Sequence, residues 1–216
     1  MILVLGSQKG GGGKSTLTAN ISALLAEQGK DVVVVDADRQ SSSSFWAAER
    51  AQEHKDLPKV HCVQKYENIK DTLLDLNDRY EVVICDTAGH DSIELRSSIL
   101  VAHQLLIPLR PAIFDLKTIP KMQEIIEQSL LINPDIVVNA VLTMCPTNPI
   151  VGEKDDAIEY LEDFPSVNLI KTVIRDRKIY RDSTNLGLGV TEMLSNTSAS
   201  AKKAREEIQD LIREIM

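Results

Sequence analysis

The chain has 216 residues, of which 43% are hydrophobic, 4% aromatic and 26% charged, and its net charge is −8. This length suits one domain over residues 1–216 with a core that needs no disulfide, and the composition excludes a disordered chain. No run approaches the ~18 apolar residues of a spanning helix, and Met1 to Leu5 is too short for a signal peptide. We therefore expect a cytoplasmic protein that does not bind membranes.

Strand-like and helical segments alternate along the whole chain, and several strand-like segments are continuous aliphatic runs. Such runs are typical of parallel strands that are covered on both faces. Strands are expected at about 2–5, 31–36, 59–63, 81–86, 104–108, 136–142 and 167–170. Helices are expected near 14–28, 43–54, 67–76, 92–102, 116–131, 155–162 and 198–215. The pattern predicts an α/β fold with a doubly wound, mostly parallel sheet, helices on both faces, and ligands at the carboxyl ends of the strands.

A glycine-rich loop separates the first expected strand from the first expected helix, the context of a phosphate-binding loop. Glycine lets backbone N–H groups approach an anion, and the helix N-terminus adds a favourable dipole. Lys14 would reach the β- and γ-phosphates, and the Ser15 hydroxyl would bind Mg²⁺. The sequence therefore predicts ATP and Mg²⁺ as cofactors, bound by Lys9, Gly10, Gly11, Gly12, Gly13, Lys14, Ser15 and Thr16.

The loop departs from the ordinary phosphate-loop pattern at its start. Gln8 occupies the first glycine position, and Lys9 adds a second lysine in the order K-G-G-x-G-K-[ST]. Lys9 could be a solvated loop residue, but a lysine there points away from its own nucleotide. We expect it to act on a triphosphate held by a facing subunit, which implies a homodimer that encloses ATP.

Three aspartates follow two of the expected strands. Asp86 ends an apolar strand, where a carboxylate holds Mg²⁺ in phosphate-loop enzymes; the alternative is a helix N-cap. Asp36 and Asp38 follow the second strand with one residue between them, so they point to opposite sides if the backbone is extended. One of this pair could instead cap the turn at 41–44.

The chain resembles the ParA/MinD family of partition ATPases in these motifs and in two further stretches. Val32 to Gln40 is similar to a strand followed by D-x-D-P-Q, and Tyr80 to Gly89 is similar to a Walker B strand. The stretch from Arg177 to Glu192 resembles R-x-x-Y-x-x-S…G…V-x-E of small plasmid partition ATPases. Arg39 stands where proline is usual, and the residues after Asp86 lack the prolines of many relatives.

The resemblance implies roles for several residues. Asp38 is expected to position or activate the attacking water, and Asp36 to lie near the metal and the phosphate loop. Lys9, Lys14 and Asp38 are thus the expected catalytic residues, and Ser15, Asp36 and Asp86 the expected metal site. The implied partners are a second copy of the chain, nonspecific DNA and a ParB-like centromere-binding or cargo adaptor. This places the protein on the nucleoid.

Charge is unevenly distributed along the acidic chain. Residues 166–216 contain nine Lys or Arg against seven Asp or Glu, a net +2, whereas the preceding 165 residues carry −10. A local basic face can bind phosphates, although it can equally be a solvated helix face. The expected DNA-binding residues are Arg175, Arg177, Lys178, Arg181, Lys202 and Lys203.

The adenine contacts are the least defined part of the site. Thr143, Met144 and Pro146 follow an expected strand and are candidates for the base pocket. An apolar stripe at Ile208, Leu211, Ile212 and Ile215 could be a MinD-like membrane anchor. Residues 202–214 carry four positive and four negative charges and no aromatic residue, so packing on the sheet is favoured.

These features together predict a DNA-partition ATPase with slow basal turnover. ATP would join two protomers on DNA, and an adaptor would trigger hydrolysis and release of a plasmid, chromosome or organelle. A MinD-like membrane-associated positioning ATPase is the alternative. A ligase or an iron–sulfur reductase of the same fold is less consistent with the sequence, which shows no suitable cysteines and no residues of a substrate pocket.

Overall fold

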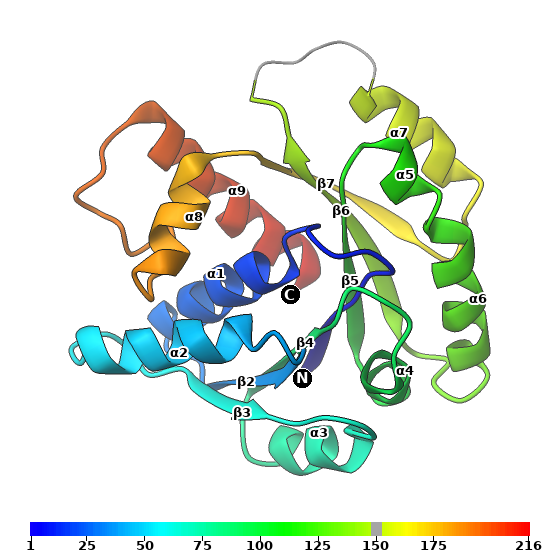
Figure 1. Cartoon of the computed structure of the whole chain (residues 1–216), viewed down its shortest axis with the longest axis horizontal. Helices are drawn as coiled ribbons and strands as arrows, with labels where there is room; N and C mark the ends of the chain where they lie inside the picture. Colours follow the sequence, from blue (N-terminus) through cyan, green and yellow to red (C-terminus); the bar gives the residue numbers. More distant parts are fainter. Residues whose placement is uncertain (148–152) are drawn as a thin grey trace.

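A parallel sheet forms the centre of the computed structural model, which describes residues 1–147 and 153–216 (Figure 1). Within those residues seven strands pair in the order β3-β2-β4-β1-β5-β6-β7, and every pairing is parallel. This confirms the predicted fold class. The strands are β1 (Ile2–Leu5), β2 (Val32–Ala37), β3 (His61–Gln64), β4 (Val82–Thr87), β5 (Gln104–Leu109), β6 (Val137–Cys145) and β7 (Asn168–Arg175).

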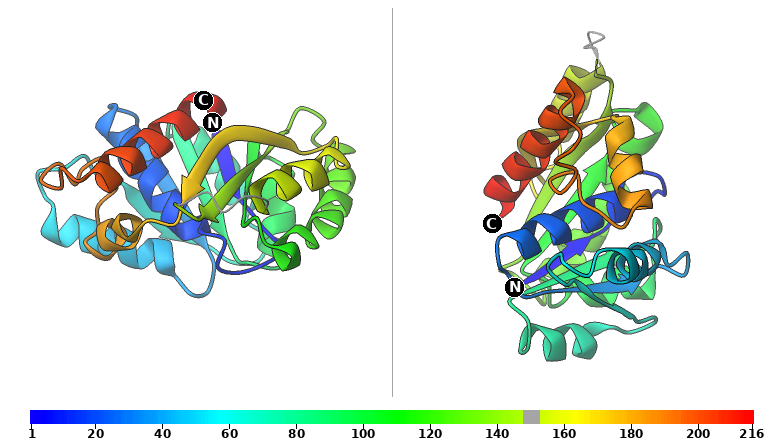
Figure 2. Two further views of the ribbon diagram at one scale, coloured as in Figure 1. Left: turned by 90° about the horizontal axis from the view of Figure 1, so that it is seen from above. Right: turned by 90° about the vertical axis from the view of Figure 1, so that its left-hand side faces the viewer.

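Helices cover both faces of the sheet, as the views in Figure 2 show. One face carries α1, α2, α8 and α9, and the other carries α3, α4 and α6. The helices are α1 (Lys14–Glu27), α2 (Ser42–Glu53), α3 (Lys70–Asn77), α4 (Ile93–Ile99), α5 (Ile113–Leu116), α6 (Ile119–Leu130), α7 (Glu153–Glu162), α8 (Lys178–Asn185) and α9 (Ala199–Ile215).

Alternate residues of each central strand supply the two cores. In β1, Leu3 and Leu5 pack into the core under α1 and α9, whereas Ile2 and Val4 pack into the opposite core. All four side chains are fully buried. A strand buried on both faces has no polar alternation, which explains why β1, β2 and β4 read as continuous aliphatic runs.

The C-terminal helix packs on the sheet rather than standing free. Ile208, Leu211, Ile212 and Ile215 are all buried in the core shared with α1. The described part of the chain contains no helix that is both long and apolar enough to cross a bilayer. The expectation that this apolar stripe serves packing is therefore confirmed.

Several sequence-based boundaries are wrong, and two of the described helices, α5 and α8, were not predicted. The expected helix over 116–131 corresponds to α6, which begins at Ile119 with Pro120 in its first turn, where its missing N–H costs no helical bond. Strand β7 extends to Arg175 rather than ending at Ile170. Helix α8 has only two large buried side chains, Ile179 and Tyr180, among polar residues, which gives little hydrophobic period to detect.

The connections after β1, β2, β4 and β5 meet at the carboxyl edge of the sheet. Strand β1 lies between β4 and β5 in the middle of the sheet. In a doubly wound fold this reversal of strand order opens a crevice for a ligand. The topology therefore brings together the glycine loop and the acidic residues that follow β2 and β4.

Candidate functional site

The glycine loop joins the end of β1 to the start of α1. Gly11 and Gly13 have φ values of 79° and 90°, a left-handed conformation that L side chains rarely adopt. A Cβ on Gly12 would lie 2.9 Å from the carbonyl oxygen of Pro108. The N-cap residue of α1 is Gly13, which has no side chain to cap the helix, so the N–H groups of the first turn can bind an anion. The local structure is that of a phosphate-binding loop.

Lys14 is held inside this loop. Its side chain is buried, and Nζ donates a 2.9 Å hydrogen bond to Ser7 Oγ. Burial lowers the pKa of Lys14, and the charges of Asp86 and Asp38 act in the opposite direction. A desolvated ammonium group next to free helical N–H groups is well suited to a polyphosphate.

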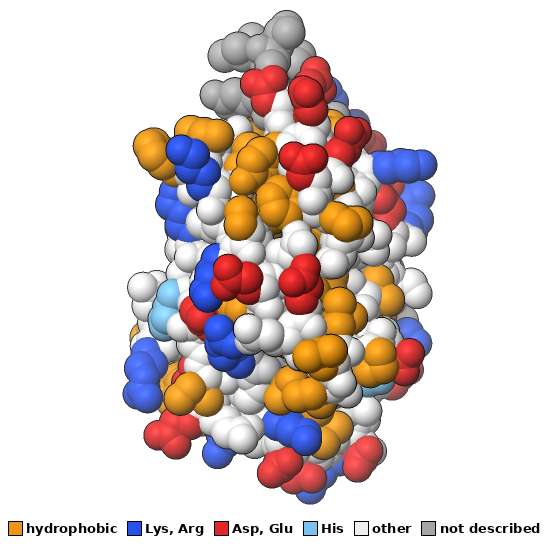
Figure 3. Space-filling view, turned by 90° about the vertical axis from the view of Figure 1, so that its right-hand side faces the viewer, with side chains coloured by type: hydrophobic (Ala, Val, Ile, Leu, Met, Phe, Trp, Pro, Cys, Tyr) orange, Lys and Arg blue, Asp and Glu red, His pale blue; other side chains and the backbone are white. Residues whose placement is uncertain are grey.

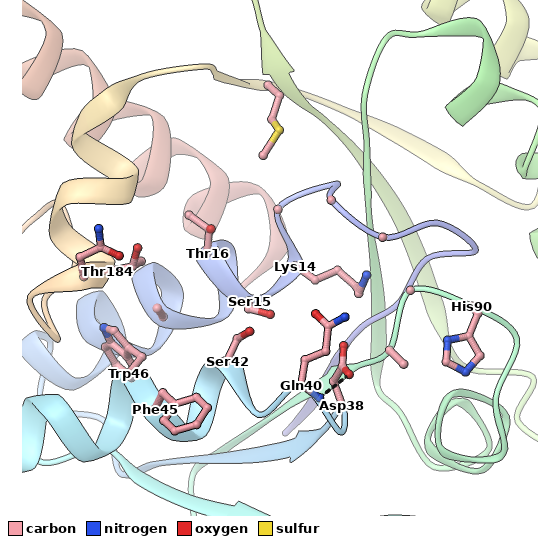
Figure 4. Close-up of a pocket in the computed structure, with 18 of the residues that line it drawn as sticks. Lys14, Ser15, Thr16, Asp38, Gln40, Ser42, Phe45, Trp46, His90 and Thr184 are labelled. Atoms are coloured by element: carbon pink, nitrogen blue, oxygen red, sulfur yellow. Dashed lines mark hydrogen bonds between the residues drawn. The ribbon is translucent and has the colours of Figure 1, made fainter.

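A cleft of about 830 Å³ opens over the loop. Figure 4 shows Lys14, Ser15, Asp38 and Gln40 grouped around one space, with Phe45 and Trp46 of α2 beyond Ser42. His90 stands on the opposite side of the opening. Lining residues therefore come from the loops after β1, β2 and β4, from α1, α2 and α8, and from the end of β6.

Asp86, at the end of β4, is buried, and only one of its two carboxylate oxygens accepts a hydrogen bond from the described residues. Its Oδ2 accepts a 2.6 Å hydrogen bond from Ser43 Oγ, while Oδ1 is buried with no hydrogen-bond partner among the described residues. Burial raises the pKa of Asp86 to about 6, against the opposing effects of the Ser43 and Ser15 hydroxyls. An unpartnered carboxylate oxygen beside a serine hydroxyl fits a divalent cation, which takes oxygen ligands.

Asp36 lies beside Asp86 in the sheet register and holds the loop that follows β2. It is fully buried; its Oδ1 accepts from the N–H of Asp38 at 3.2 Å and its Oδ2 from the N–H of Ser44 at 2.7 Å. Both oxygens thus hold the loop that precedes α2 and cap that helix. Asp36 therefore shapes the loop that carries Asp38, and its expected place in the metal site stays a prediction.

Asp38 remains accessible at the mouth of the cleft. Its Oδ1 accepts a 2.9 Å hydrogen bond from the N–H of Gln40, drawn as a dashed line in Figure 4. The next turn passes through Ser41, which has a left-handed φ of 56°. The carboxylate is therefore oriented by its own loop and faces the same space as Lys14.

Lys9 does not lie beside Lys14. Its Nζ is 2.8 Å from Asp115 Oδ2, and Arg110 Nε lies 3.7 Å from the other oxygen of that carboxylate. The Lys9 side chain is 44% exposed, whereas Asp115 is buried. Sequence reasoning missed Asp115, because it belongs to the short helix α5 that follows a different strand.

Two of the three residues expected to contact the base lie together in the structure. A small hollow beside Gly13 and Thr16 is lined by Thr143 and Met144 but not by Pro146, whose carbonyl accepts from Arg175 Nη1. Thr143 is buried and donates to the carbonyl of Gly12 at 2.8 Å. Leu17 of α1 also lines the hollow, and further lining residues come from the end of β7, the connection to α8, and α8 itself: Ile174, Arg175, Asp176, Arg177, Tyr180 and Arg181.

The basic segment near α8 is largely paired with acids. Arg177 is 8% exposed and binds Glu207 through Nε and Nη2 at 2.9 and 2.7 Å. We therefore remove Arg177 from the expected DNA-contacting set. Lys178 and Arg181 pair with Asp182 and Asp176 but stay 78% and 62% exposed, and Lys202 and Lys203 are exposed on α9.

The fold and site define the class of the protein. A glycine loop between a central parallel strand and a helix, with a buried lysine and a strand-end aspartate, is the arrangement of a P-loop nucleotide-binding domain. The chain matches the CobQ/CobB/MinD/ParA nucleotide binding domain family over residues 3–214, and it belongs to that family. The resemblance inferred from the motifs is confirmed.

Similar curated proteins include one named for carboxysome distribution and one named ParA. Maintenance of carboxysome distribution protein A from Halothiobacillus neapolitanus is 28% identical over 218 residues, covering 99% of this chain and 95% of that protein. Protein ParA from Rhizobium radiobacter is 31% identical over 145 residues, covering 66% of this chain and 64% of the relative.

A solved structure shows the same fold at low identity. The septum site-determining protein MinD from Pyrococcus horikoshii OT3, complexed with Mg-ADP, superimposes with a TM-score of 0.77 at 18% identity. The superposition covers 99% of this chain and 95% of that one.

Proposed function

We propose that this protein is an ATP-hydrolysing switch that positions a large cargo along DNA. The observation that carries the proposal is a phosphate loop with two lysines, the second of which has its ammonium group on Asp115 and not beside Lys14. Lys14 is buried in the loop, whereas Lys9 is half exposed and tied to Asp115. The related proteins named for carboxysome distribution and for ParA support a positioning role.

The residues of the cleft suit binding and hydrolysis of ATP. Lys14 and the N–H groups of residues 10–16 would hold the phosphates, and the complex of MinD with Mg-ADP supports a magnesium nucleotide as ligand. Mg²⁺ would be held by Ser15 and Asp86 and would neutralise charge on the phosphates. Asp38 would orient the attacking water, since its carboxylate is accessible and fixed by its loop.

ATP would join two protomers. Lys9 would leave Asp115 and place its ammonium group on the triphosphate of the partner subunit. The positive charge of Lys9 reaches the triphosphate only after the dimer forms. A single protomer lacks this charge in the transition state of hydrolysis, so we expect slow basal turnover. An adaptor protein that completes or rearranges this site would accelerate hydrolysis and release the cargo.

DNA would bind to the exposed cations near α8 and the start of α9. Lys178, Arg181, Lys202 and Lys203 form the proposed DNA surface, with Arg175 at its edge. The face in Figure 3, on the other side of the molecule, instead has basic and acidic side chains interspersed. The basic surface of one protomer would bind DNA weakly. When ATP joins two protomers, the second protomer contacts DNA that the first already holds, so the dimer binds DNA more tightly.

Light scattering with a non-hydrolysable ATP analogue tests the dimer. We expect the wild-type protein to double its mass, Lys9→Ala to bind the analogue as a monomer, and Lys14→Ala to lose analogue binding. Lys121→Ala, an exposed and paired lysine on α6, is the matched control. A wild-type monomer at saturating analogue would refute the switch.

DNA retention with ATP, ADP and no nucleotide tests the binding surface. We expect retention only with ATP, and the double reversal Lys178→Glu/Arg181→Glu to weaken it about tenfold or more at moderate salt. Lys121→Glu should leave it unchanged. If the double reversal binds DNA like wild type, the surface lies elsewhere.

A further inference from the structure

A serine of α2 holds the strand-end acid of the metal site. Ser43 and Asp86 are both about 1% exposed, and the 2.6 Å hydrogen bond between them occupies Asp86 Oδ2. The other oxygen, Oδ1, has no hydrogen-bond partner among the described residues. The Ser43 hydroxyl therefore fixes Oδ2, and Oδ1, on the carboxylate that the Ser15 hydroxyl also influences, can accept a ligand.

The N-terminal end of α2 is fixed next to this contact. The N–H of Ser44 donates to Asp36 Oδ2 at 2.7 Å, so the helix begins on two buried carboxylates. Negative charge at a helix N-terminus is favourable because it meets the positive end of the helix dipole. The backbone at Ser43 is therefore held beside Asp86 by the bond between Ser44 and Asp36.

The other half of α2 is anchored to the segment between α8 and α9. Arg50 Nη2 and Nη1 bind the two oxygens of Glu192 at 2.5 and 2.7 Å, and both side chains are 2% exposed. Trp46 Nε1 donates to the carbonyl of Leu188 at 3.2 Å. Arg50 lies seven residues after Ser43, about 10 Å along the helix, so these contacts restrict sliding of the helix.

We propose that Ser43 is a positioning residue for the metal-binding carboxylate. Its hydroxyl orients Asp86 so that Oδ1 faces the divalent cation, and α2 keeps that hydroxyl in place. The inference rests on the proposed function of the same site. If the hydrogen bond served only to satisfy a buried carboxylate, its loss would change stability and leave metal affinity unaltered.

Manganese binding in the presence of ADP, followed by electron paramagnetic resonance, measures this role without hydrolysis. We expect Ser43→Ala to weaken Mn²⁺ binding about tenfold or more, the typical effect of losing a partner of a metal ligand. Binding of ADP in EDTA should stay at the wild-type value. Ser129→Ala is the control, because it removes a similarly buried hydroxyl on α6, far from the site.

A pair of isosteric variants isolates the hydroxyl from side-chain volume. Ser43→Thr keeps the donor and Ser43→Val lacks it, so any strain from the extra methyl group is common to both. Retained Mn²⁺ affinity in Ser43→Thr with about tenfold loss in Ser43→Val supports the proposal. Equal affinities in the two variants overturn it, and this comparison decides the question even if Ser43→Ala fails to fold.

The proposed function and this inference fail differently. If the wild-type protein binds no Mn²⁺ with ADP and hydrolyses no ATP, the proposed function itself is wrong. If the wild-type protein does both and Ser43→Val binds Mn²⁺ as Ser43→Thr does, only the role of Ser43 is wrong.

Discussion

The glycine loop and the basic segment around α8 are both short, charged stretches, yet they relate to the fold in different ways. The loop conformation is fixed by its glycines, and Lys14 remains directed at the site. In the basic segment, Arg177 is buried against Glu207, thirty residues away, while its neighbour Lys178 is exposed. A backbone motif thus predicts its own geometry, whereas a run of charges does not reveal which charges are free.

The largest expected effect lies in the loop region. Asp38→Ala should slow ATP hydrolysis by about 10²–10⁴-fold, because the attacking water loses its orienting carboxylate. Nucleotide binding should persist, so ATP-bound dimers should accumulate on DNA. Phosphate release and DNA retention measure the two halves of this prediction.

The exposed Asp56→Ala is the matched control for Asp38 and should behave as wild type in both assays. Hydrolysis at the wild-type rate in Asp38→Ala would remove Asp38 from the reaction.

Within the basic segment, neighbouring residues should differ sharply in stability. Arg177→Ala should cost roughly 3–5 kcal/mol, because it leaves the largely buried Glu207 without its counterion. Lys178→Ala should cost about 0–0.5 kcal/mol, since it removes only an exposed helical pair. Urea unfolding of both variants tests the contrast. Similar costs for the two substitutions would show that the Arg177 pair is not structural.

Asp86 should make the nucleotide-free protein sensitive to pH. Its folded pKa, about 6, lies above the ordinary carboxyl value of 3.8, so the folded state binds the proton more tightly. This contribution to stability is present at low pH and is lost as pH rises from about 4 to 6. At pH 8 in EDTA, Asp86→Asn should therefore be more stable than wild type by about 1–3 kcal/mol.

The advantage of Asp86→Asn should shrink toward pH 4 and reverse when Mg²⁺ and ATP are added, because only the wild type gains metal binding. Thermal melts at both pH values, with and without the ligands, measure this. A stability difference that is the same at pH 4 and pH 8 would exclude ionisation of Asp86 as its cause.

The smallest effect concerns release of Lys9. Asp115→Ala removes the carboxylate that holds Lys9 in its own protomer, so dimerisation should need about two- to fivefold less ATP analogue. Scattering at graded analogue concentrations measures the shift. The exposed Asp135→Ala is the control, and a higher requirement in Asp115→Ala would show that Asp115 assists the dimer.

The sequence by itself determined the fold class and the phosphate loop. Strand β1, the glycines and Lys14 are consecutive, and their conformations follow from local sterics and hydrophobic runs. The same local logic placed Asp86 at a strand end. These features need no distant partner to be recognised.

Only the tertiary structure decided which side chains meet across the fold. The contacts of Ser43 with Asp86, Lys9 with Asp115 and Arg177 with Glu207 span 43, 106 and 30 residues. Packing around the sheet brings these partners together, and burial then determines whether a charge is paired or available. A single sequence contains the residues of such pairs but not the distances between them.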